Sequence, residues 1–326
     1  MTRRGWCPSV FTPMPADDGL LVRVKPTASQ FSAAQVAGLA EAAARDGNGK
    51  VQLTNRANLQ LRGFTAASAE RFAQTMIDLG LASPDPRVEA VRNVMCSPLA
   101  GADPDAIDTR AYAIALETLL VDQPALQELP PKFGFAVDSG GLAVLPRSAD
   151  ILVTVQDDHA FVGLPDSPVA HRTAASPAAV AAAARALAET FLAKDEPRMR
   201  YLVEDLGGEQ VFALAGLAAD RFAPPQPFAL PVGFTGYGDG QGCFTAALEF
   251  GQCDAPVLLS LAEMADRHAD GRIAATPWRA YVLPLAREPG TVAKTLAAAG
   301  FIVNSADPRV VTTEAGALEG VAELLR

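Results

Sequence analysis

Residues 39–54 read Leu-Ala-Glu-Ala-Ala-Ala-Arg-Asp-Gly-Asn-Gly-Lys-Val-Gln-Leu-Thr, and residues 261–276 carry the related stretch Leu-Ala-Glu-Met-Ala-Asp-Arg-His-Ala-Asp-Gly-Arg-Ile-Ala-Ala-Thr. The matches stay in register, because Leu39 and Leu261, like Thr54 and Thr276, are 222 positions apart. The tetrapeptide Asp-Pro-Arg-Val at residues 85–88 recurs at residues 307–310 with the same separation. Self-similarity at a fixed separation indicates a repeated structural unit. We therefore expect the fold to be built on a duplication.

Each copy predicts the order strand, helix, strand, strand, helix. In the first copy, residues 19–25 form a short apolar run typical of a strand, and Ser32 with Gln35 forms a capping box before a helix. That helix is expected to end at residues 46–49, with two strands around residues 54–57 and a second helix at 66–79. In the second copy, Asp254 takes the place of Ser32 as the predicted N-cap. This order favours the α+β class, with helices on one face of a small sheet.

A larger block separates the two copies. Residues 113–119 and 177–193 look helical, and residues 133–137 and 151–155 look like strands. Pro224, Pro225 and Pro227 mark the most plausible linker before the second copy. The expected domains are a first unit at 1–87, an α/β block at 88–225 and a second unit at 226–326.

Composition limits the functions that the chain can have. Its 326 residues are 49% hydrophobic, which is enough for sizeable cores. The formal net charge of -10 argues against nucleic-acid binding, which needs a basic face. There is no apolar run long enough to span a membrane and no apolar leader near the start, so a cytoplasmic protein without membrane contact is expected.

Common catalytic and metal-binding motifs are missing from the sequence. No HExxH, GxSxG or P-loop pattern occurs, so the catalytic residues are unknown and no metal site is expected. The three histidines are dispersed and indicate structural or surface roles, and the Gly-Tyr-Gly-Asp-Gly-Gln-Gly stretch at 236–242 is interpreted as a flexible loop. The cysteines form no CxxC pair and are interpreted as ordinary buried thiols; they are Cys7, Cys96, Cys243 and Cys253.

Basic residues beside predicted strand turns are more informative. They are Arg56, Arg62, Arg92, Lys132 and Arg279. An acidic protein that binds a polycarboxylate would need such a converging set, because guanidinium groups clamp carboxylates through paired hydrogen bonds. The alternative is that these are solvated charges at strand ends.

Several longer motifs carry a family resemblance over essentially the whole chain. They include Arg3-Arg4-Gly5-Trp6-Cys7-Pro8-Ser9, the run from Leu53 to Gly63 (Leu-Thr-Asn-Arg-Ala-Asn-Leu-Gln-Leu-Arg-Gly), Arg92-Asn93-Val94-Met95, Lys132-Phe133-Gly134 and Thr276-Pro277-Trp278-Arg279. Together they resemble the precorrin-3B synthases, cobalamin-pathway relatives of the sulfite and nitrite reductases.

The resemblance implies a fold and a ligand. It implies two ferredoxin-like sulfite/nitrite reductase units flanking a larger α/β block, with siroheme and a coupled [4Fe–4S] cluster as the cofactors of the superfamily. It also implies oxidoreductase chemistry on precorrin-3A, a tetrapyrrole that bears acetates and propionates and is hydroxylated with γ-lactone formation. The residues that it suggests for tetrapyrrole or substrate binding are Arg56, Asn58, Arg62, Arg92, Asn93, Lys132 and Arg279.

The sequence departs from that family at the cluster ligands. Where the family carries Cys-x5-Cys after the second Asp-Pro-Arg-Val, residues 313–320 read Thr-Glu-Ala-Gly-Ala-Leu-Glu-Gly. The family's second large block, with its Cys-x3-Cys, is expected to be absent, and so is a self-contained iron–sulfur cluster, because such clusters need thiolates. Two interpretations stay open. One is an oxidoreductase of cobalamin synthesis, acting alone or as half of a split enzyme completed by a homodimer or a partner chain. The other is a non-redox tetrapyrrole-binding or accessory protein.

Overall fold

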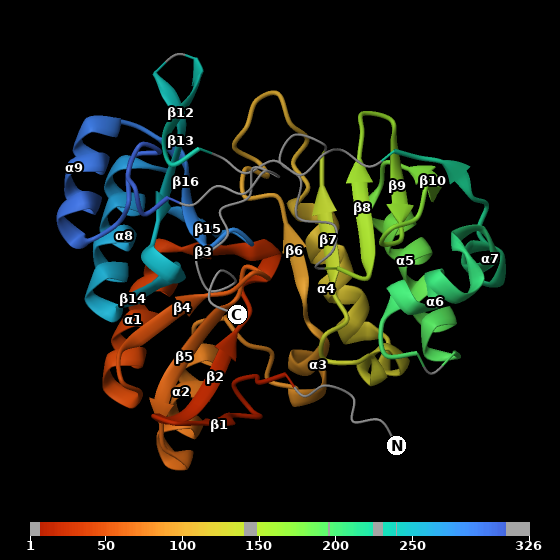
Figure 1. Ribbon diagram of the computed structural model, residues 1–326, viewed down its shortest axis with the longest axis horizontal. Helices are drawn as coiled ribbons and strands as arrows, with labels where there is room; N and C mark the ends of the chain where they lie inside the picture. Colours follow the sequence, from red (N-terminus) through yellow and green to blue (C-terminus); the bar gives the residue numbers. More distant parts are fainter. Residues whose placement is uncertain (1–6, 140–148, 195, 224–230, 239, 311–326) are drawn as a thin grey trace. The chain divides into compact units, whose positions relative to one another are not determined.

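The structure is a computed structural model that describes residues 7–139, 149–194, 196–223, 231–238 and 240–310 (Figure 1). Their contacts divide them into two compact units. The duplicated unit contains residues 8–84, 102–104 and the described part of 228–326, and so includes both copies of the repeat. The central unit contains Cys7, residues 85–101 and the described part of 105–227. No described helix is long and apolar enough to cross a membrane.

The two copies in the duplicated unit have matching elements. The first copy runs through β1 (Met14–Ala16), β2 (Gly19–Val24), the 3-10 helix η1 (Thr27–Ser29), β3 (Gln30–Ser32), α1 (Ala33–Asp46), β4 (Lys50–Leu53), β5 (Leu59–Phe64) and α2 (Ala66–Asp78). The second runs through β12 (Gly233–Gly238), β13 (Gln241–Ala247), η4 (Glu249–Gly251), β14 (Gln252–Asp254), α8 (Ala255–His268), β15 (Arg272–Ala275), β16 (Ala280–Ala286) and α9 (Pro289–Ala299). The predicted strand, helix, strand, strand, helix order is present in both copies, but each copy has two further short strands before its first helix that were not predicted.

Local sequence accounts for where the first helices begin. The Ser32 hydroxyl accepts a hydrogen bond from the Gln35 backbone N–H at 3.1 Å, and the Gln35 side-chain oxygen accepts one from the Ser32 N–H at 2.8 Å. The predicted capping box is thus confirmed. Asp254 also stands at an N-cap, but its side chain makes no capping hydrogen bond. The predicted N-cap position is therefore confirmed, but the Asp254 carboxylate does not cap the helix and lies 3.3 Å from the Lys50 ammonium.

The two copies exchange one edge strand each. The first sheet has the order β1-β2-β5-β4-β14 and the second the order β12-β13-β16-β15-β3, so each sheet ends with a strand from the other copy. The exchange is symmetric: the Ala33 N–H donates to the Gly271 carbonyl, and the Ala255 N–H to the Gly49 carbonyl, both at 2.8 Å. Ala28 and Phe250, just before the exchanged strands, both have positive φ, 51° and 53°. Since each edge needs the other copy, the two copies form one structural unit.

A shared hydrophobic core joins the copies. Helices α1 and α8 pack against each other (Figure 1), and one cluster of buried side chains includes members of both copies. Val36 and Leu39 of α1, and Leu258 and Leu261 of α8, are at most 1% exposed. In β4 and β5 the alternate residues Val51, Leu53, Leu59 and Leu61 are buried in this cluster, so the residues between them lie on the opposite face of the first sheet.

The central unit is an α/β layer. It consists of α3 (Pro86–Val91), β6 (Val94–Cys96), α4 (Arg110–Asp122), the 3-10 helix η2 (Pro124–Glu128), β7 (Phe135–Asp138), β8 (Ile151–Val155), β9 (His159–Gly163), β10 (Val169–Ala174), α5 (Pro177–Leu192), α6 (Met199–Leu206), α7 (Gly208–Leu214) and β11 (Asp220–Arg221). The sheet order is β11-β10-β9-β8-β7-β6, with β6, β7 and β8 parallel and the other neighbours antiparallel. Helices α4 and α5 pack on this sheet (Figure 1). The predicted helices and strands of this block are confirmed, with β7 starting two residues later than expected.

One expected loop is ordered. Most of the glycine-rich stretch at 236–242 lies in the adjoining ends of β12 and β13, which pair as an antiparallel hairpin, so its interpretation as a plain flexible loop is wrong. Gly238 has a φ of 102°, which explains why glycine is used in the hairpin. The predicted linker prolines at 224, 225 and 227, the opening motif at 3–6 and the stretch at 313–320 lie outside the described residues.

Candidate functional site

The turn between β4 and β5 positions Arg56 and Asn58. The Thr54 N–H donates to the Asn58 carbonyl at 2.9 Å, and the Ala57 N–H donates to the Thr54 carbonyl at 3.1 Å. The Thr54 hydroxyl oxygen accepts from the backbone N–H groups of Arg56 and Asn58 at 3.3 and 3.2 Å. Asn58 is buried and Arg56 half-buried. A single threonine thus fixes the backbone that carries both predicted residues.

The equivalent turn between β15 and β16 carries Arg279. Thr276 plays the part of Thr54: its hydroxyl donates to the Ala280 carbonyl at 2.7 Å, and the Arg279 N–H donates to the Thr276 carbonyl at 3.2 Å. Arg279 has a φ of 61° and corresponds by position to Ala57, whose φ is 55°. The two arginines are therefore not equivalent, because the position of Arg56 in the second copy is taken by Trp278, which is 3% exposed.

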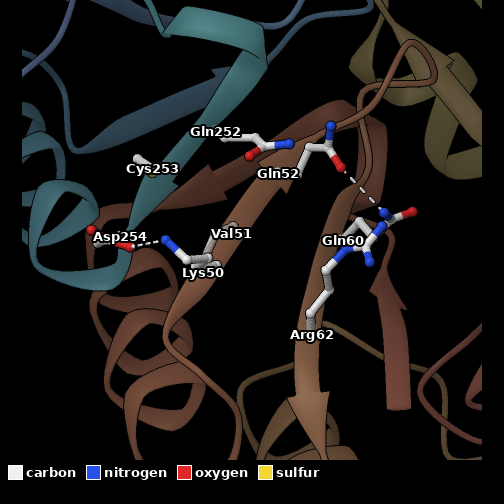
Figure 2. Close-up of a pocket in the computed structure, with 8 residues that line it drawn as sticks. All are labelled: Lys50, Val51, Gln52, Gln60, Arg62, Gln252, Cys253 and Asp254. Carbon is white, nitrogen blue, oxygen red and sulfur yellow. Dashed lines mark hydrogen bonds and ion pairs between the residues drawn. The ribbon is translucent and has the colours of Figure 1, made fainter. Parts of the chain in front are cut away.

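Arg62 lines a cavity on the first sheet. The cavity has a volume of about 220 Å³, and its walls come from β4, β5 and the exchanged strand β14 (Figure 2). Its lining residues are Lys50, Val51, Gln52, Gln60, Arg62, Gln252, Cys253 and Asp254. The Arg62 side chain is 41% exposed, and its guanidinium lies 3.7 Å from the Asp18 carboxylate. The guanidinium is therefore weakly held and accessible to a ligand.

In the central unit, Arg92, Asn93 and Lys132 are close neighbours. The Asn93 side-chain amide donates to the carbonyls of Pro131 and Phe133 at 3.0 and 3.3 Å, on either side of Lys132. Asn93 thereby holds the short segment that presents Lys132, whose side chain is exposed. The structure thus brings these three predicted residues together.

Arg92 is buried between carboxylates. Its guanidinium lies 3.1 Å from Glu89 and 3.3 Å from Glu117, and all three residues are buried. Burial alone would lower the pKa of Arg92, but the negative charges of Glu89 and Glu117 outweigh it and hold the pKa above its ordinary value. These contacts favour a positioning role for Arg92, in which it fixes the start of the Asn93 segment.

The described cysteines do not fit an iron–sulfur cluster. Cys7, Cys96 and Cys243 are buried and Cys253 is partly buried, and none of the four forms a disulfide. Burial raises the pKa of Cys96 and Cys253 to about 12, so both are protonated thiols at neutral pH. In the described part of the chain, no group of three or more histidine, cysteine, aspartate or glutamate side chains is arranged to hold a metal ion.

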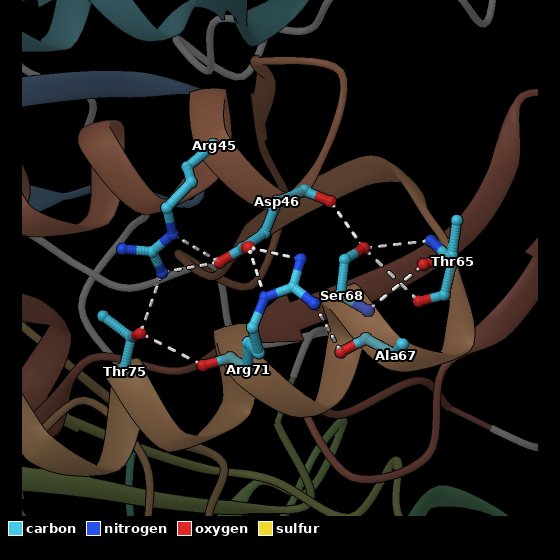
Figure 3. Close-up of polar contacts among 7 residues, drawn as sticks. All are labelled: Arg45, Asp46, Thr65, Ala67, Ser68, Arg71 and Thr75. Atoms are coloured by element: carbon cyan, nitrogen blue, oxygen red, sulfur yellow. Dashed lines mark hydrogen bonds and ion pairs between the residues drawn. The ribbon is translucent and has the colours of Figure 1, made fainter.

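A polar cluster joins the two helices of the first copy. The buried Asp46 carboxylate accepts hydrogen bonds from Arg45 at 2.6 Å and from Arg71 at 3.2 Å (Figure 3). The Ser68 hydroxyl donates to the Asp46 carbonyl at 2.6 Å, which links the end of α1 to the start of α2. Burial raises the pKa of Asp46, but the hydrogen bonds and charges of Arg45 and Arg71 outweigh it, so the pKa lies below its ordinary value. This cluster is structural.

Sequence reasoning missed most of the cavity. The alternation of Lys50 and Gln52 with buried residues in β4, and of Gln60 with buried residues in β5, was a usable signal for a polar face. Gln252 and Asp254 could not be placed there, because nothing in the sequence indicates that β14 joins the first sheet.

Comparisons with known proteins agree with this architecture. Residues 13–78 match the nitrite/sulfite reductase ferredoxin-like half domain, and residues 88–221 match the nitrite and sulphite reductase 4Fe-4S domain. The NirA protein of Mycobacterium tuberculosis has a similar fold, with a TM-score of 0.71 and 19% identity over 88% of this chain and 57% of that chain. The chain therefore has the nitrite and sulfite reductase fold, and it spans little more than half the length of that solved structure.

Two relatives of known name show to which family the chain belongs. A precorrin-3B synthase of Sinorhizobium sp is 36% identical over 328 aligned positions, which cover 96% of this chain and 69% of the relative. A ferredoxin–nitrite reductase of Leptolyngbya laminosa is 30% identical over 41% of this chain and 28% of the relative. The chain belongs to the precorrin-3B synthase family.

Proposed function

We propose that this protein binds an anionic tetrapyrrole of corrin biosynthesis, such as precorrin-3A. The observation that carries the proposal is the 36% identity with a precorrin-3B synthase over 96% of the chain. The basic residues give it a physical basis, because a chain with a net charge of -10 needs local cations to meet a polycarboxylate. The proposed place of action is the cytoplasm, where a biosynthetic enzyme of this family would meet its substrate.

The proposed binding residues fall into two groups. In the duplicated unit, Arg56, Arg62 and Arg279 would pair with carboxylates, and Asn58 would hold the turn that presents Arg56. In the central unit, Lys132 would pair with a carboxylate, while Arg92 and Asn93 position it. Support comes from the Thr54 turn, from the exposure of Arg62 and from the two Asn93 hydrogen bonds.

The basic residues of the candidate site fit the carboxylates of a tetrapyrrole, and siroheme would be held through the same contacts. The described cysteines do not fit a [4Fe–4S] cluster. A redox reaction of the family's kind would then depend on cluster ligands supplied by another chain, by a second copy or by residues beyond those described. A second candidate function is therefore a non-redox tetrapyrrole-binding or accessory protein. The burial of Cys7, Cys96 and Cys243, with no group of side chains arranged to hold a metal among the described residues, favours it.

A binding titration tests the proposal. Uroporphyrin III, an octacarboxylate tetrapyrrole, is titrated into the wild-type protein, Arg56→Ala and the matched control Arg185→Ala, and the shift of the porphyrin absorption band is recorded. Arg185 is a suitable control because it lies on α5 in an exposed pair with Glu189. We expect Arg56→Ala to weaken binding about tenfold or more and Arg185→Ala to leave it unchanged, since a hydrogen bond to a charged group contributes roughly 1.5–3 kcal/mol. Absence of binding by the wild-type protein refutes the proposal.

A further inference from the structure

The segment that carries Lys132 is held from two sides within the central unit. On one side, the Asn93 side-chain amide donates to the carbonyls before and after Lys132 at 3.0 and 3.3 Å. On the other side, the Gly134 N–H donates to the Asp150 carboxylate at 3.1 Å, and the Gly134 carbonyl accepts from the Asp150 N–H at 2.7 Å. Within residues 131–134, Lys132 is the exposed residue. Asp150 is therefore a second support of the segment.

Protein donors occupy the whole carboxylate of Asp150, which is 1% exposed. Its Oδ1 accepts from the Arg198 Nε at 2.9 Å and from the Met199 N–H at 3.1 Å. Its Oδ2 accepts from the Arg198 Nη2 at 3.0 Å and from the Gly134 N–H at 3.1 Å. An ionised carboxylate offers about four acceptor positions, so these four contacts fill it. Asp150 can therefore influence a ligand only through the residues that it holds.

The same carboxylate ties the segment to the start of α6. Arg198 is the N-cap residue of α6, but its own side chain makes no capping hydrogen bond. The Asp150 carboxylate takes the N–H of Met199 instead, at the helix end where negative charge is favoured. The Arg198 side chain is 20% exposed and clamps both carboxylate oxygens, which fixes the orientation of the carboxylate. That orientation places the Gly134 N–H, two residues after Lys132.

A largely buried ion pair is a weak source of stability, because the loss of hydration offsets most of the attraction between the charges. Its directional hydrogen bonds nevertheless hold one backbone geometry, and a lysine on a flexible stem meets a carboxylate reliably only if its backbone is fixed. We propose that Asp150, clamped by Arg198, is a positioning residue that fixes Lys132 for contact with a ligand carboxylate. This role rests on the proposed function and adds two residues that it does not assign.

A double-mutant cycle tests this role through binding. Uroporphyrin III is titrated into the wild type, Asp150→Asn, Lys132→Ala and the double variant, at a temperature where each keeps the near-ultraviolet circular dichroism of the wild type. Asp150→Asn preserves the shape of the side chain but turns one acceptor oxygen into a donor that faces donors. The matched control is Asp46→Asn, because Asp46 is a buried carboxylate held by two arginines in the duplicated unit.

We expect Lys132→Ala to weaken binding about tenfold and Asp150→Asn to weaken it about threefold or more. In the Lys132→Ala background, Asp150→Asn should cause no further loss, because a positioning residue acts only through the group that it positions. Asp46→Asn should bind as the wild type does. A purely structural role of Asp150 would instead give the same change in both backgrounds.

Equal losses in the two backgrounds, or wild-type affinity of Asp150→Asn beside a weakened Lys132→Ala, overturn the positioning role and leave the proposed function standing. Wild-type affinity of Lys132→Ala removes Lys132 from the site and overturns the positioning role with it. Absence of binding by the wild type refutes the proposed function as well. If Asp150→Asn does not fold, the cycle is run with Arg198→Lys, which keeps the charge but loses the paired geometry and should show the same dependence on Lys132.

Discussion

Replacing Asp46 by asparagine tests the structural cluster at the end of α1. The Asp46 side chain is fully buried, whereas the Arg45 and Arg71 side chains are 56% and 60% exposed. A neutral amide weakens the hydrogen bonds from both arginines, each worth roughly 1.5–3 kcal/mol when one partner is charged. Because the arginine charges remain partly in water, we discount that sum and expect a loss of about 2 kcal/mol. For this unit the loss corresponds to a fall in Tm of about 4–8 °C.

The measurement is urea unfolding followed by tryptophan fluorescence. The chain has two tryptophans, so a Trp6→Phe background leaves Trp278, which is buried in the duplicated unit, as the reporter. Glu263→Gln is the control, since Glu263 forms an exposed pair with Arg267 on α8 and its loss should cost about 0.3–0.5 kcal/mol.

The pH dependence of the Asp46→Asn effect has a defined sign. The folded-state pKa of Asp46 lies below the ordinary 3.8, so the stabilising effect is fully present above that value. It is lost as the pH falls through the folded-state pKa. The gap between wild type and Asp46→Asn should therefore be constant from pH 7 to about 5 and shrink in more acidic buffer. A gap under about 0.5 kcal/mol at pH 7, or one that persists unchanged at pH 2, would show that the Asp46 charge does not stabilise the fold through these arginines.

Three further predictions concern other parts of the chain. Arg92→Ala should destabilise the central unit by about 3–5 kcal/mol, because it leaves the charges of Glu89 and Glu117 buried without the guanidinium between them; Arg87→Ala, at an exposed pair, should change the unfolding free energy by less than about 1 kcal/mol. Gly63→Ala should destabilise more than Gly207→Ala in thermal melts, since both glycines have a φ near 80° but only the Gly63 Cβ would meet Asn48. Iodoacetamide at pH 8 should label Cys96 and Cys243 only after unfolding, because burial raises the pKa of both thiols; rapid labelling of either in the native protein would contradict their described burial.

Much of the duplicated fold could be predicted because its signals are local. Ser32 and Gln35 mark a helix start through a capping box, and the fixed separation of Leu39 and Leu261 identifies the repeat without any pairing information. The exchange of β3 and β14 could not be predicted, since strands of three residues pair through backbone groups and carry almost no side-chain pattern. Asp254 illustrates the limit: an aspartate at an N-cap position suggests a cap, yet the exchanged strand places it beside Lys50.

The sequence predicted which residues belong to the candidate site better than it predicted how they are placed and paired. Arg56 and Arg279 were recognised from their motifs, but their non-equivalence depends on which turn position each occupies. The pairing of Arg92 with Glu117 joins two helices and has no local signal, so a residue expected to meet a ligand is held by protein carboxylates instead. The domain boundaries and the roles of the seven site residues stay predictions.

Tetrapyrrole binding by this chain is tested by anaerobic purification followed by one equilibrium titration with uroporphyrin III. We expect saturable binding of about one equivalent that weakens as salt is raised, because the binding depends on lysine and arginine contacts to carboxylates. The same sample should contain no stoichiometric iron or acid-labile sulfide. No saturable binding, or binding that requires a stoichiometric cluster on this chain, would show that the chain is not a cluster-free tetrapyrrole-binding protein.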